Sequence, residues 1–249
     1  MNSEKNVTEP LILMIESSGN VAGTALVRGK KVLAEYMTDL KKTHSETLMP
    51  MIDQMMELTG IKPSEINAVA VSGGPGSFTG LRIGSATAKG LALSLDVPMI
   101  HVPTIDAMAY QCPFFEGWIV PMMDARRNQV FTGIYRFDTK DGERSFEVIK
   151  PAFAMDITEL LTMIKAEGTP SVLFLGDGAE VFADKIREML PGAVFAPDFM
   201  GKQRAGAAGL LVYDMYERGE TEAAADHKPE YLRQSQAERE REKKLGQEQ

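Results

Sequence analysis

The fold of this 249-residue chain follows from the stretch Ser72-Gly73-Gly74-Pro75-Gly76-Ser77-Phe78-Thr79-Gly80-Leu81-Arg82-Ile83-Gly84. An apolar run at residues 68–71, typical of a strand, precedes it, and residues 85–95 have the Ala, Leu and Lys content of a helix. Glycines at a strand-to-helix junction let a backbone or a ligand approach closely, while the amides of the first helical turn stay free. The stretch therefore predicts a phosphate-binding loop, a docking element or a simple tight turn, shaped by Gly73, Gly74, Gly76 and Gly80.

The sequence around this stretch predicts the same order of strands, turns and helices twice. Residues 11–37 alternate apolar segments with short polar turns, and a helix follows to about Leu58, with Thr43 and Glu46 spaced as a capping box. The second half repeats strand, acid, turn and strand at residues 118–137, and Asp156 is placed to cap a later helix. We expect a helix at about residues 204–218 to complete this half. Two such halves predict an α/β protein with two mixed sheets, outer helices and a cleft between the halves.

The composition of the chain excludes several classes of protein and of site. The chain is 44% apolar and 25% charged, as in ordinary globular proteins, and no apolar run is long enough to span a membrane. The polar N-terminus does not look like a signal peptide, so we expect a cytoplasmic protein. Its net charge of −8 argues against nucleic-acid binding by this chain alone, because phosphate contacts require clustered cations. The single cysteine, Cys112, excludes an internal disulfide and a cysteine-based metal site.

The motifs resemble those of a known family. The glycine-rich stretch is similar to the signature of the TsaB (YeaZ) family, and four further segments support the resemblance over most of the chain: residues 12–18, His44-Ser45-Glu46-Thr47-Leu48, Met123-Asp124-Ala125-Arg126 and Pro229-Glu230-Tyr231-Leu232-Arg233. The resemblance implies the duplicated actin-like fold (ASKHA, ribonuclease H-like), in agreement with the internal repeat. We accordingly divide the chain into an N-terminal half at residues 8–103, a C-terminal half at 104–235 and a charged tail at 236–249.

The resemblance also implies a function. TsaB-like proteins support the transfer of threonylcarbamoyl to the adenosine beside the anticodon of tRNAs that read ANN codons. They act as non-catalytic scaffold or dimerisation subunits that bind a TsaD-type catalytic subunit and work with a TsaE-type ATPase. The implied partners are therefore TsaD, TsaE, a second copy of the chain when alone, and tRNA only through the complex. The alternative function is that of an actin-like ATPase or small-molecule kinase that uses the cleft.

The residues favour a non-catalytic scaffold subunit over an ATPase or kinase. A pair of histidines four positions apart on one helix would suit a metal, but His44, His101 and His227 are scattered, so we expect no metal site. Gly80 is followed by Leu81-Arg82 where a Walker loop has Lys-Ser/Thr, which favours a shaping and docking role for the loop. We expect no tightly bound cofactor, with ATP, ADP and Mg²⁺ engaged only through the complex. Weak nucleotide contacts would involve Glu16, Ser17, Ser18 and Asp124.

The resemblance places the partner interface on two helices of the N-terminal half, at about residues 44–58 and 79–95. The contact residues that we expect are His44, Leu48, Met51, Met55, Thr79, Arg82 and Ile83. The first helix carries a methionine-rich stripe, which suits an adaptable interface. Arg82 lies in a first helical turn, where the helix dipole disfavours a cation, so we predict an acidic or carbonyl partner for it.

Overall fold

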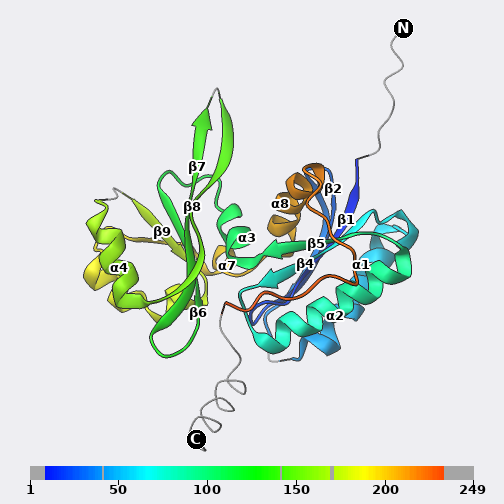
Figure 1. The fold of residues 1–249 in the computed structure, drawn as a ribbon, viewed down its shortest axis with the longest axis horizontal. Helices are drawn as coiled ribbons and strands as arrows, with labels where there is room; N and C mark the ends of the chain where they lie inside the picture. The colour runs from blue at the N-terminus through cyan, green and yellow to red at the C-terminus, as the bar shows by residue number, and fades with distance from the viewer. Residues whose placement is uncertain (1–8, 41, 141, 169–170, 233–249) are drawn as a thin grey trace, which may run out of the picture.

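Two five-stranded mixed sheets form the two halves of the molecule (Figure 1). The structure is a computed structural model and describes residues 9–40, 42–140, 142–168 and 171–232. The tail predicted at residues 236–249 lies outside these ranges.

The N-terminal sheet has the strand order β3-β2-β1-β4-β5. Its strands are β1 (Leu11–Glu16), β2 (Ala22–Arg28), β3 (Lys31–Thr38), β4 (Ala68–Gly74) and β5 (Met99–Pro103). Strands β1 to β3 form an antiparallel meander, and β4 and β5 continue from β1 in parallel. Every residue of β1 and β4 is buried, because these central strands have helices on both faces.

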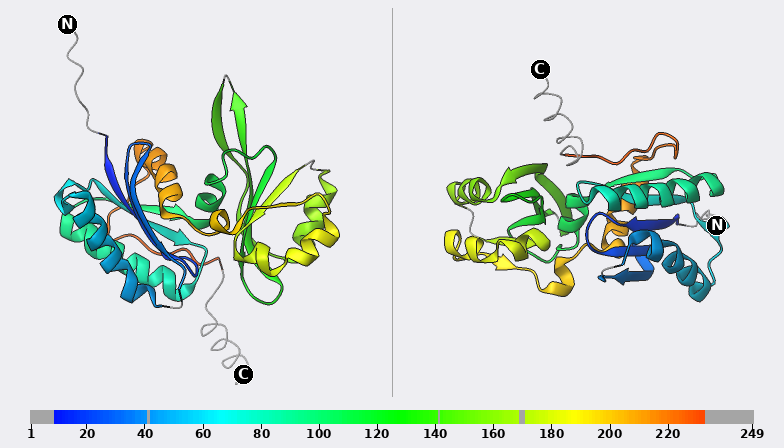
Figure 2. Two further views of the ribbon diagram at one scale, coloured as in Figure 1. Left: turned by 180° about the vertical axis from the view of Figure 1, so that it is seen from behind. Right: turned by 90° about the horizontal axis from the view of Figure 1, so that it is seen from below.

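The second sheet repeats this topology. Its order is β10-β9-β6-β7-β8, with β6 (Trp118–Asp124), β7 (Gln129–Lys140), β8 (Glu143–Asp156), β9 (Val172–Leu175) and β10 (Val194–Phe195). Read from the meander, 8-7-6-9-10 corresponds to 3-2-1-4-5 of the first half, with the same parallel and antiparallel pairs. The predicted duplication and the predicted fold class are thereby confirmed. The β7–β8 hairpin extends beyond its sheet (Figures 1 and 2).

Helices cover both faces of the N-terminal sheet. On one face, α1 (His44–Thr59) and α2 (Phe78–Leu95) enclose a core with β1, β2 and β4, and the short η1 (Pro63–Glu65) connects α1 to β4. As predicted, Thr43 is the N-cap of α1, and the Glu46 carboxylate accepts a hydrogen bond from the Thr43 backbone N–H at 3.3 Å. None of the described helices is long and apolar enough to cross a membrane.

The other face of the N-terminal sheet is covered by a helix from the far end of the sequence. Helix α8 (Ala205–Glu217) packs its apolar residues against β1 and β2, so it does not complete the second half as we predicted. Its small residues allow close packing on this face, because a side chain at Gly209 would lie 2.4 Å from Val27. Helix α3 (Thr104–Tyr110) lies between the halves and contributes to the cores of both.

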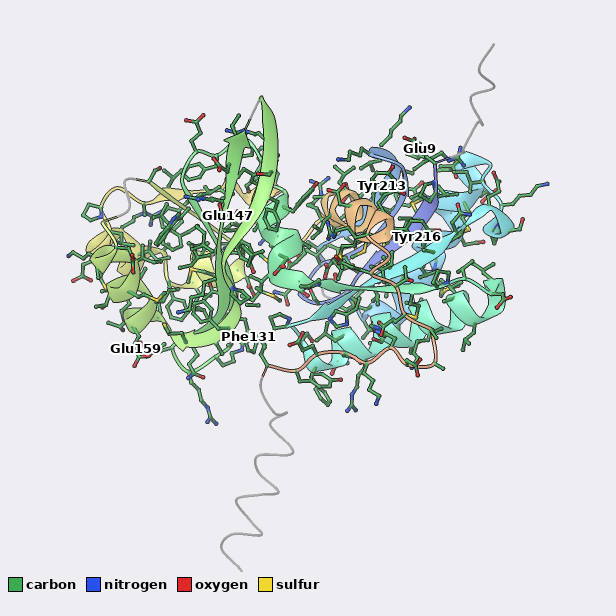
Figure 3. All side chains as sticks on the ribbon, turned by 45° about the horizontal axis from the view of Figure 1, so that its top comes forward. Glu9, Phe131, Glu147, Glu159, Tyr213 and Tyr216 are labelled. Atoms are coloured by element: carbon green, nitrogen blue, oxygen red, sulfur yellow. The ribbon has the colours of Figure 1, made fainter. Side chains whose placement is uncertain are left out.

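The second sheet is covered on its outer face by α4 (Ile157–Ala166), α5 (Asp177–Val181) and α6 (Ala183–Met189). As predicted, Asp156 caps α4, and its carboxylate accepts from the backbone N–H of Thr158 at 2.7 Å. A short helix, α7 (Asp198–Gly201), leads into α8. Side chains fill the interior of both halves (Figure 3).

Candidate functional site: the cleft between the halves

A cleft of about 420 Å³ lies where equivalent ends of the two sheets face each other. Four parts of the chain line it: the β1–β2 turn, the glycine-rich loop, the β6–β7 turn with the adjoining strand ends and the start of α5, and residues 230–232. The last of these belong to residues 218–232, which follow α8 and are called the C-terminal segment below. The lining residues are Ser18, Gly19, Asn20, Pro75, Gly76, Ser77, Phe78, Met123, Asp124, Ala125, Arg126, Phe131, Asp177, Glu230, Tyr231 and Leu232. The cleft therefore occupies the position at which open α/β folds bind ligands.

The glycine-rich loop is shorter than its sequence suggested. Strand β4 continues to Gly74, and a cis peptide bond joins Gly74 to Pro75. Helix α2 begins at Phe78, close to the start at about residue 79 that the resemblance implied and earlier than residues 85–95, whose composition indicated a helix. Ser77 is the N-cap, and its hydroxyl accepts a hydrogen bond from the Gly80 backbone N–H at 3.3 Å. This cap starts the helix early, because it satisfies one of the free amides of the first turn.

The glycines of the loop allow close approach to other parts of the same chain. The Ser17 hydroxyl donates to the Gly80 carbonyl at 2.9 Å, and a side chain at Gly80 would lie 2.1 Å from the Ser17 carbonyl oxygen. Side chains at the other three predicted glycines would collide similarly: at Gly73 with His101, at Gly74 with Glu230 and at Gly76 with Ser18. These glycines are therefore required by packing within the chain, whatever else the loop contacts.

Glu16 ends β1 directly behind the cleft and is only 1% exposed. One carboxylate oxygen accepts from the Ser18 backbone N–H at 2.6 Å and from the Ser18 hydroxyl at 2.5 Å, and the other accepts from the Ser72 hydroxyl. Burial raises the pKa of Glu16, although these hydrogen bonds oppose the shift. The carboxylate is turned into the protein, and of the four residues expected to contact a nucleotide only Ser18 and Asp124 line the cleft.

Asp124 occupies the equivalent position in the second half. Its carboxylate accepts from the Arg126 backbone N–H at 2.8 Å and pairs with the Arg126 guanidinium at 3.2 Å. Its own backbone N–H donates to Asp177, whose pKa is raised by burial and, more weakly, by the charge of Asp124. The turn that follows holds Arg126, Arg127 and Asn128 at φ values of 66°, 56° and 59°, an arrangement that the sequence did not indicate.

The C-terminal segment forms one wall of the cleft. The Glu230 backbone N–H donates to the Gly73 carbonyl at 2.7 Å, and the Tyr231 ring packs on Phe78 with centroids 4.8 Å apart. Arg82 lies over the Phe78 ring at 3.9 Å and donates from Nε to the Tyr231 hydroxyl at 3.2 Å. The predicted acidic or carbonyl partner of Arg82 is thus replaced, among the described residues, by a phenol and an aromatic face. Our sequence reasoning identified this segment only through the family resemblance.

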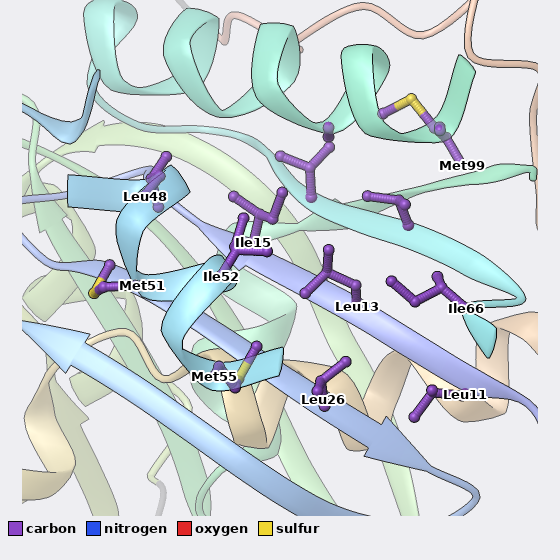
Figure 4. Close-up of a cluster of buried hydrophobic side chains, with 14 of the residues drawn as sticks. Leu11, Leu13, Ile15, Leu26, Leu48, Met51, Ile52, Met55, Ile66 and Met99 are labelled. Carbon is purple, nitrogen blue, oxygen red and sulfur yellow. The ribbon is translucent and has the colours of Figure 1, made fainter. Parts of the chain in front are cut away.

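The methionine-rich stripe of α1 does not face a partner. Leu48, Met51 and Met55 are 1%, 9% and 0% exposed and point toward the sheet (Figure 4). Our expectation that these three side chains form contacts at the interface is therefore corrected: they complete the N-terminal core. The large apolar side chains that α1 and α2 expose are Met49, Leu58 and Leu93, at 47%, 72% and 65%.

The other expected contact residues lie at the ends of α1 and α2 nearest the cleft. Thr79 and Arg82 are exposed, and Ile83 is half-buried. His44 is half-buried, and its Nε2 lies 3.0 Å from the Gly19 carbonyl, so a protonated Nε2 donates there. His44 thus connects the start of α1 to the β1–β2 turn.

Comparison with known proteins identifies the family. The family model described as "TsaD: tRNA N6-adenosine threonylcarbamoyltransferase" matches residues 31–240. The chain is 38% identical over 179 residues to the tRNA threonylcarbamoyladenosine biosynthesis protein TsaB of Bacillus subtilis, covering 72% of this chain and 76% of the relative. It is 29% identical over 245 residues to TsaB of Escherichia coli, covering 91% and 96%.

A solved structure has the same fold. The crystal structure titled "YeaZ from Pseudomonas aeruginosa" superposes with a TM-score of 0.70 at 21% identity, covering 89% of this chain and 99% of the other. The chain belongs to the TsaB (YeaZ) family of tRNA threonylcarbamoyladenosine biosynthesis proteins, within the wider family that includes the transferase TsaD.

Proposed function

We propose that this chain is the non-catalytic scaffold subunit of the complex that attaches threonylcarbamoyl to tRNA, and that it binds a TsaD-type catalytic subunit together with a TsaE-type ATPase. The family membership supports the pathway. The observation that supports a scaffold over an enzyme is the burial of Glu16, whose two carboxylate oxygens are already engaged by Ser18 and Ser72.

Magnesium–nucleotide chemistry does not fit this donor set. An actin-like ATPase needs an accessible carboxylate that holds a hydrated Mg²⁺ beside the phosphates. Glu16 is 1% exposed, and the Asp124 carboxylate is already paired with Arg126. A hydrolysis step through these residues would first have to break those interactions, so we assign none, and the cleft is left as a surface for protein or weak ligand contacts.

The exposed faces of α1 and α2 are the proposed binding surface for the TsaD-type subunit and, when the chain is alone, for a second copy. Met49 and Leu93 give this surface apolar anchors at its outer side. Ala86 and Gly90 are exposed on α2 and have no long side chain, and a side chain at Gly90 would meet nothing within 4 Å. A flat face with apolar anchors suits the packing of another helix pair.

Reconstitution tests the function. The chain alone should neither modify tRNA nor hydrolyse ATP, and omitting it from a mixture with the host's TsaD and TsaE should abolish modification. Sustained ATP turnover by the chain alone would refute the scaffold assignment. To separate scaffolding from chemistry, Glu16→Gln and Asp124→Asn preserve side-chain size. Normal partner binding with lost modification in these variants would favour the alternative ATPase or kinase.

The surface is tested by introducing charge. Met49→Glu or Leu93→Glu should abolish co-elution with TsaD while the circular dichroism spectrum and the melting temperature stay unchanged. Val181→Glu is the matched control, because Val181 is 60% exposed on α5 of the other half. Unchanged co-elution of both surface variants would refute this placement.

A further inference from the structure

The C-terminal segment brings two distant parts of the chain together beside β5. After α8, the chain crosses back over the N-terminal half (Figures 1 and 2). The backbones of Met99 and Glu222 exchange hydrogen bonds of 2.9 Å in both directions. The Lys89 ammonium on α2 donates to the Ala225 and His227 carbonyls at 3.2 and 2.9 Å. These contacts fix residues 222–227 against β5 and α2.

Three side chains with metal-binding groups meet at this junction. His101 on β5 and Glu222 and His227 on the C-terminal segment each offer one ligand atom, and these atoms lie within 4.8 Å of one another. The ring centroids of the two histidines are 5.6 Å apart, and Glu222 Oε1 lies 2.7 Å from His227 Nδ1. A second carboxylate, that of Glu230, is 3.9 Å from His101 Nε2. The sequence could not indicate this set, because its members come together only through the tertiary fold.

The surroundings hold these side chains in place. His101 lies over Gly73, where any side chain would come within 2.1 Å of the imidazole. His227 has a completely buried side chain, and its Nε2 lies 2.7 Å from the Ser85 hydroxyl. A metal-binding histidine usually has its second ring nitrogen fixed by such a hydrogen bond. Ser85 occupies Nε2 and leaves Nδ1 directed toward Glu222.

The order Ser85, His227, Glu222 also matches a nucleophile, base and acid arrangement. However, Ser85 is 5% exposed and His227 is 1% exposed, so a substrate has no access to the hydroxyl. A catalytic arrangement of Ser85, His227 and Glu222 would also leave His101 without a role in the cluster. Two imidazoles and a carboxylate, in contrast, are the donor set of many zinc sites.

We propose that His101, His227 and Glu222 form a binding site for a divalent transition metal of the zinc class, with Glu230 or water in the fourth position. The neutral His227 ring would bind through Nδ1 while its Nε2–H donates to Ser85, and the Glu222–His227 hydrogen bond would be replaced by two bonds to the ion. The metal would fasten the C-terminal segment to β5. Because Glu230 and Tyr231 follow directly and line the cleft, metal occupancy would also fix that wall.

The test uses the untagged full-length chain, stripped with a chelator and titrated with Zn²⁺ by calorimetry and with Co²⁺ by visible absorption. We expect one equivalent of Zn²⁺, a rise in melting temperature, and the intense ligand-field bands of tetrahedral Co²⁺. His101→Gln and Glu222→Gln should lose the cobalt bands and the zinc-dependent rise in melting temperature. Ser85→Ala should bind zinc about 10–100-fold more weakly.

His44→Gln is the control, since His44 is the one histidine outside the cluster and should leave zinc binding unchanged. Circular dichroism without metal would establish that each variant is folded before its titration is compared. The proposal is overturned if the folded parent binds no stoichiometric zinc. It is equally overturned if His101→Gln and Glu222→Gln bind zinc as the parent does.

Discussion

The guanidinium of Arg204 donates two hydrogen bonds to the carboxylate of Glu35, from Nη2 at 2.6 Å and from Nε at 3.1 Å. The Gly206 backbone N–H donates to the same carboxylate at 3.0 Å. Glu35 lies on β3, and the two donors lie at the start of α8. This bidentate contact fixes the last helix to the N-terminal sheet.

Glu35→Gln should lower the free energy of unfolding by about 1–3 kcal/mol at neutral pH, because it leaves Arg204 half-buried without its charge partner. Burial alone would raise the pKa of Glu35, but the hydrogen bonds and the Arg204 charge lower it below its usual 4.5. The stabilisation is therefore present above pH 4.5 and is lost as the pH falls through the lowered pKa. Urea unfolding across this range measures both effects. The exposed pair Arg136–Glu147 is the control, and Glu147→Gln should destabilise the protein less than Glu35→Gln does.

Glu16→Gln should make stability less dependent on pH. The folded-state pKa of Glu16 is raised by burial, so the folded protein retains a proton that the unfolded chain releases, and stability falls as the pH rises from 4.5. Glutamine removes this loss, and its amide can donate to the Ser72 hydroxyl. We expect a flatter stability profile between weakly acidic and neutral pH, measured by thermal unfolding. A steeper decline in the variant than in the parent would contradict this prediction.

Met55→Ala should lower the free energy of unfolding by about 2–5 kcal/mol, because it opens a cavity in a closed core. Met49→Ala, six residues earlier on the exposed side of α1, should change it by less than about 0.5 kcal/mol. Urea unfolding of both variants distinguishes the core face of the helix from the surface face. Similar costs for both would contradict the orientation of α1.

Arg127→Gly should raise the free energy of unfolding by about 1 kcal/mol, because Arg127 holds a left-handed conformation at φ 56° that glycine adopts without steric cost. Arg127→Ala separates the backbone from the charge, since it removes the guanidinium but keeps the β-carbon. The Arg127→Ala variant should therefore not be more stable than the parent. Equal melting temperatures for the two variants would show that the backbone conformation contributes nothing.

Local signals in the sequence predicted the elements with strong periodicity and caps. Thr43 and Asp156 cap helices as expected, and the repeated meander predicted both sheets. Predictions about which face is buried were less successful. The apolar stripe of Leu48, Met51 and Met55 is equally compatible with a core and an interface, because hydrophobic periodicity shows that a face is covered without showing what covers it.

Contacts between distant parts of the sequence could not be predicted. Nothing in residues 205–217 indicates that α8 belongs to the first sheet, since small apolar residues suit either half. The approach of His227 to His101 depends on that placement, because the C-terminal segment starts from the end of α8. The candidate cleft was predicted from the repeat, whereas the segment that walls it required the tertiary structure.

The position of α8 has a consequence for synthesis on the ribosome. Proteins emerge N-terminus first, and their domains generally fold as they appear. Here one face of the sheet formed by residues 11–103 is covered by α8, through residues that include Ala208, Leu211 and Val212. Helix α8 is translated only after nearly the whole second half. The nascent first half therefore presents Ile12, Met14 and Val27 to solvent until α8 leaves the exit tunnel. We therefore expect the two halves, although duplicates in topology, to fold as one cooperative unit, and a cut between residues 103 and 104 to leave the N-terminal fragment with one face of its sheet uncovered.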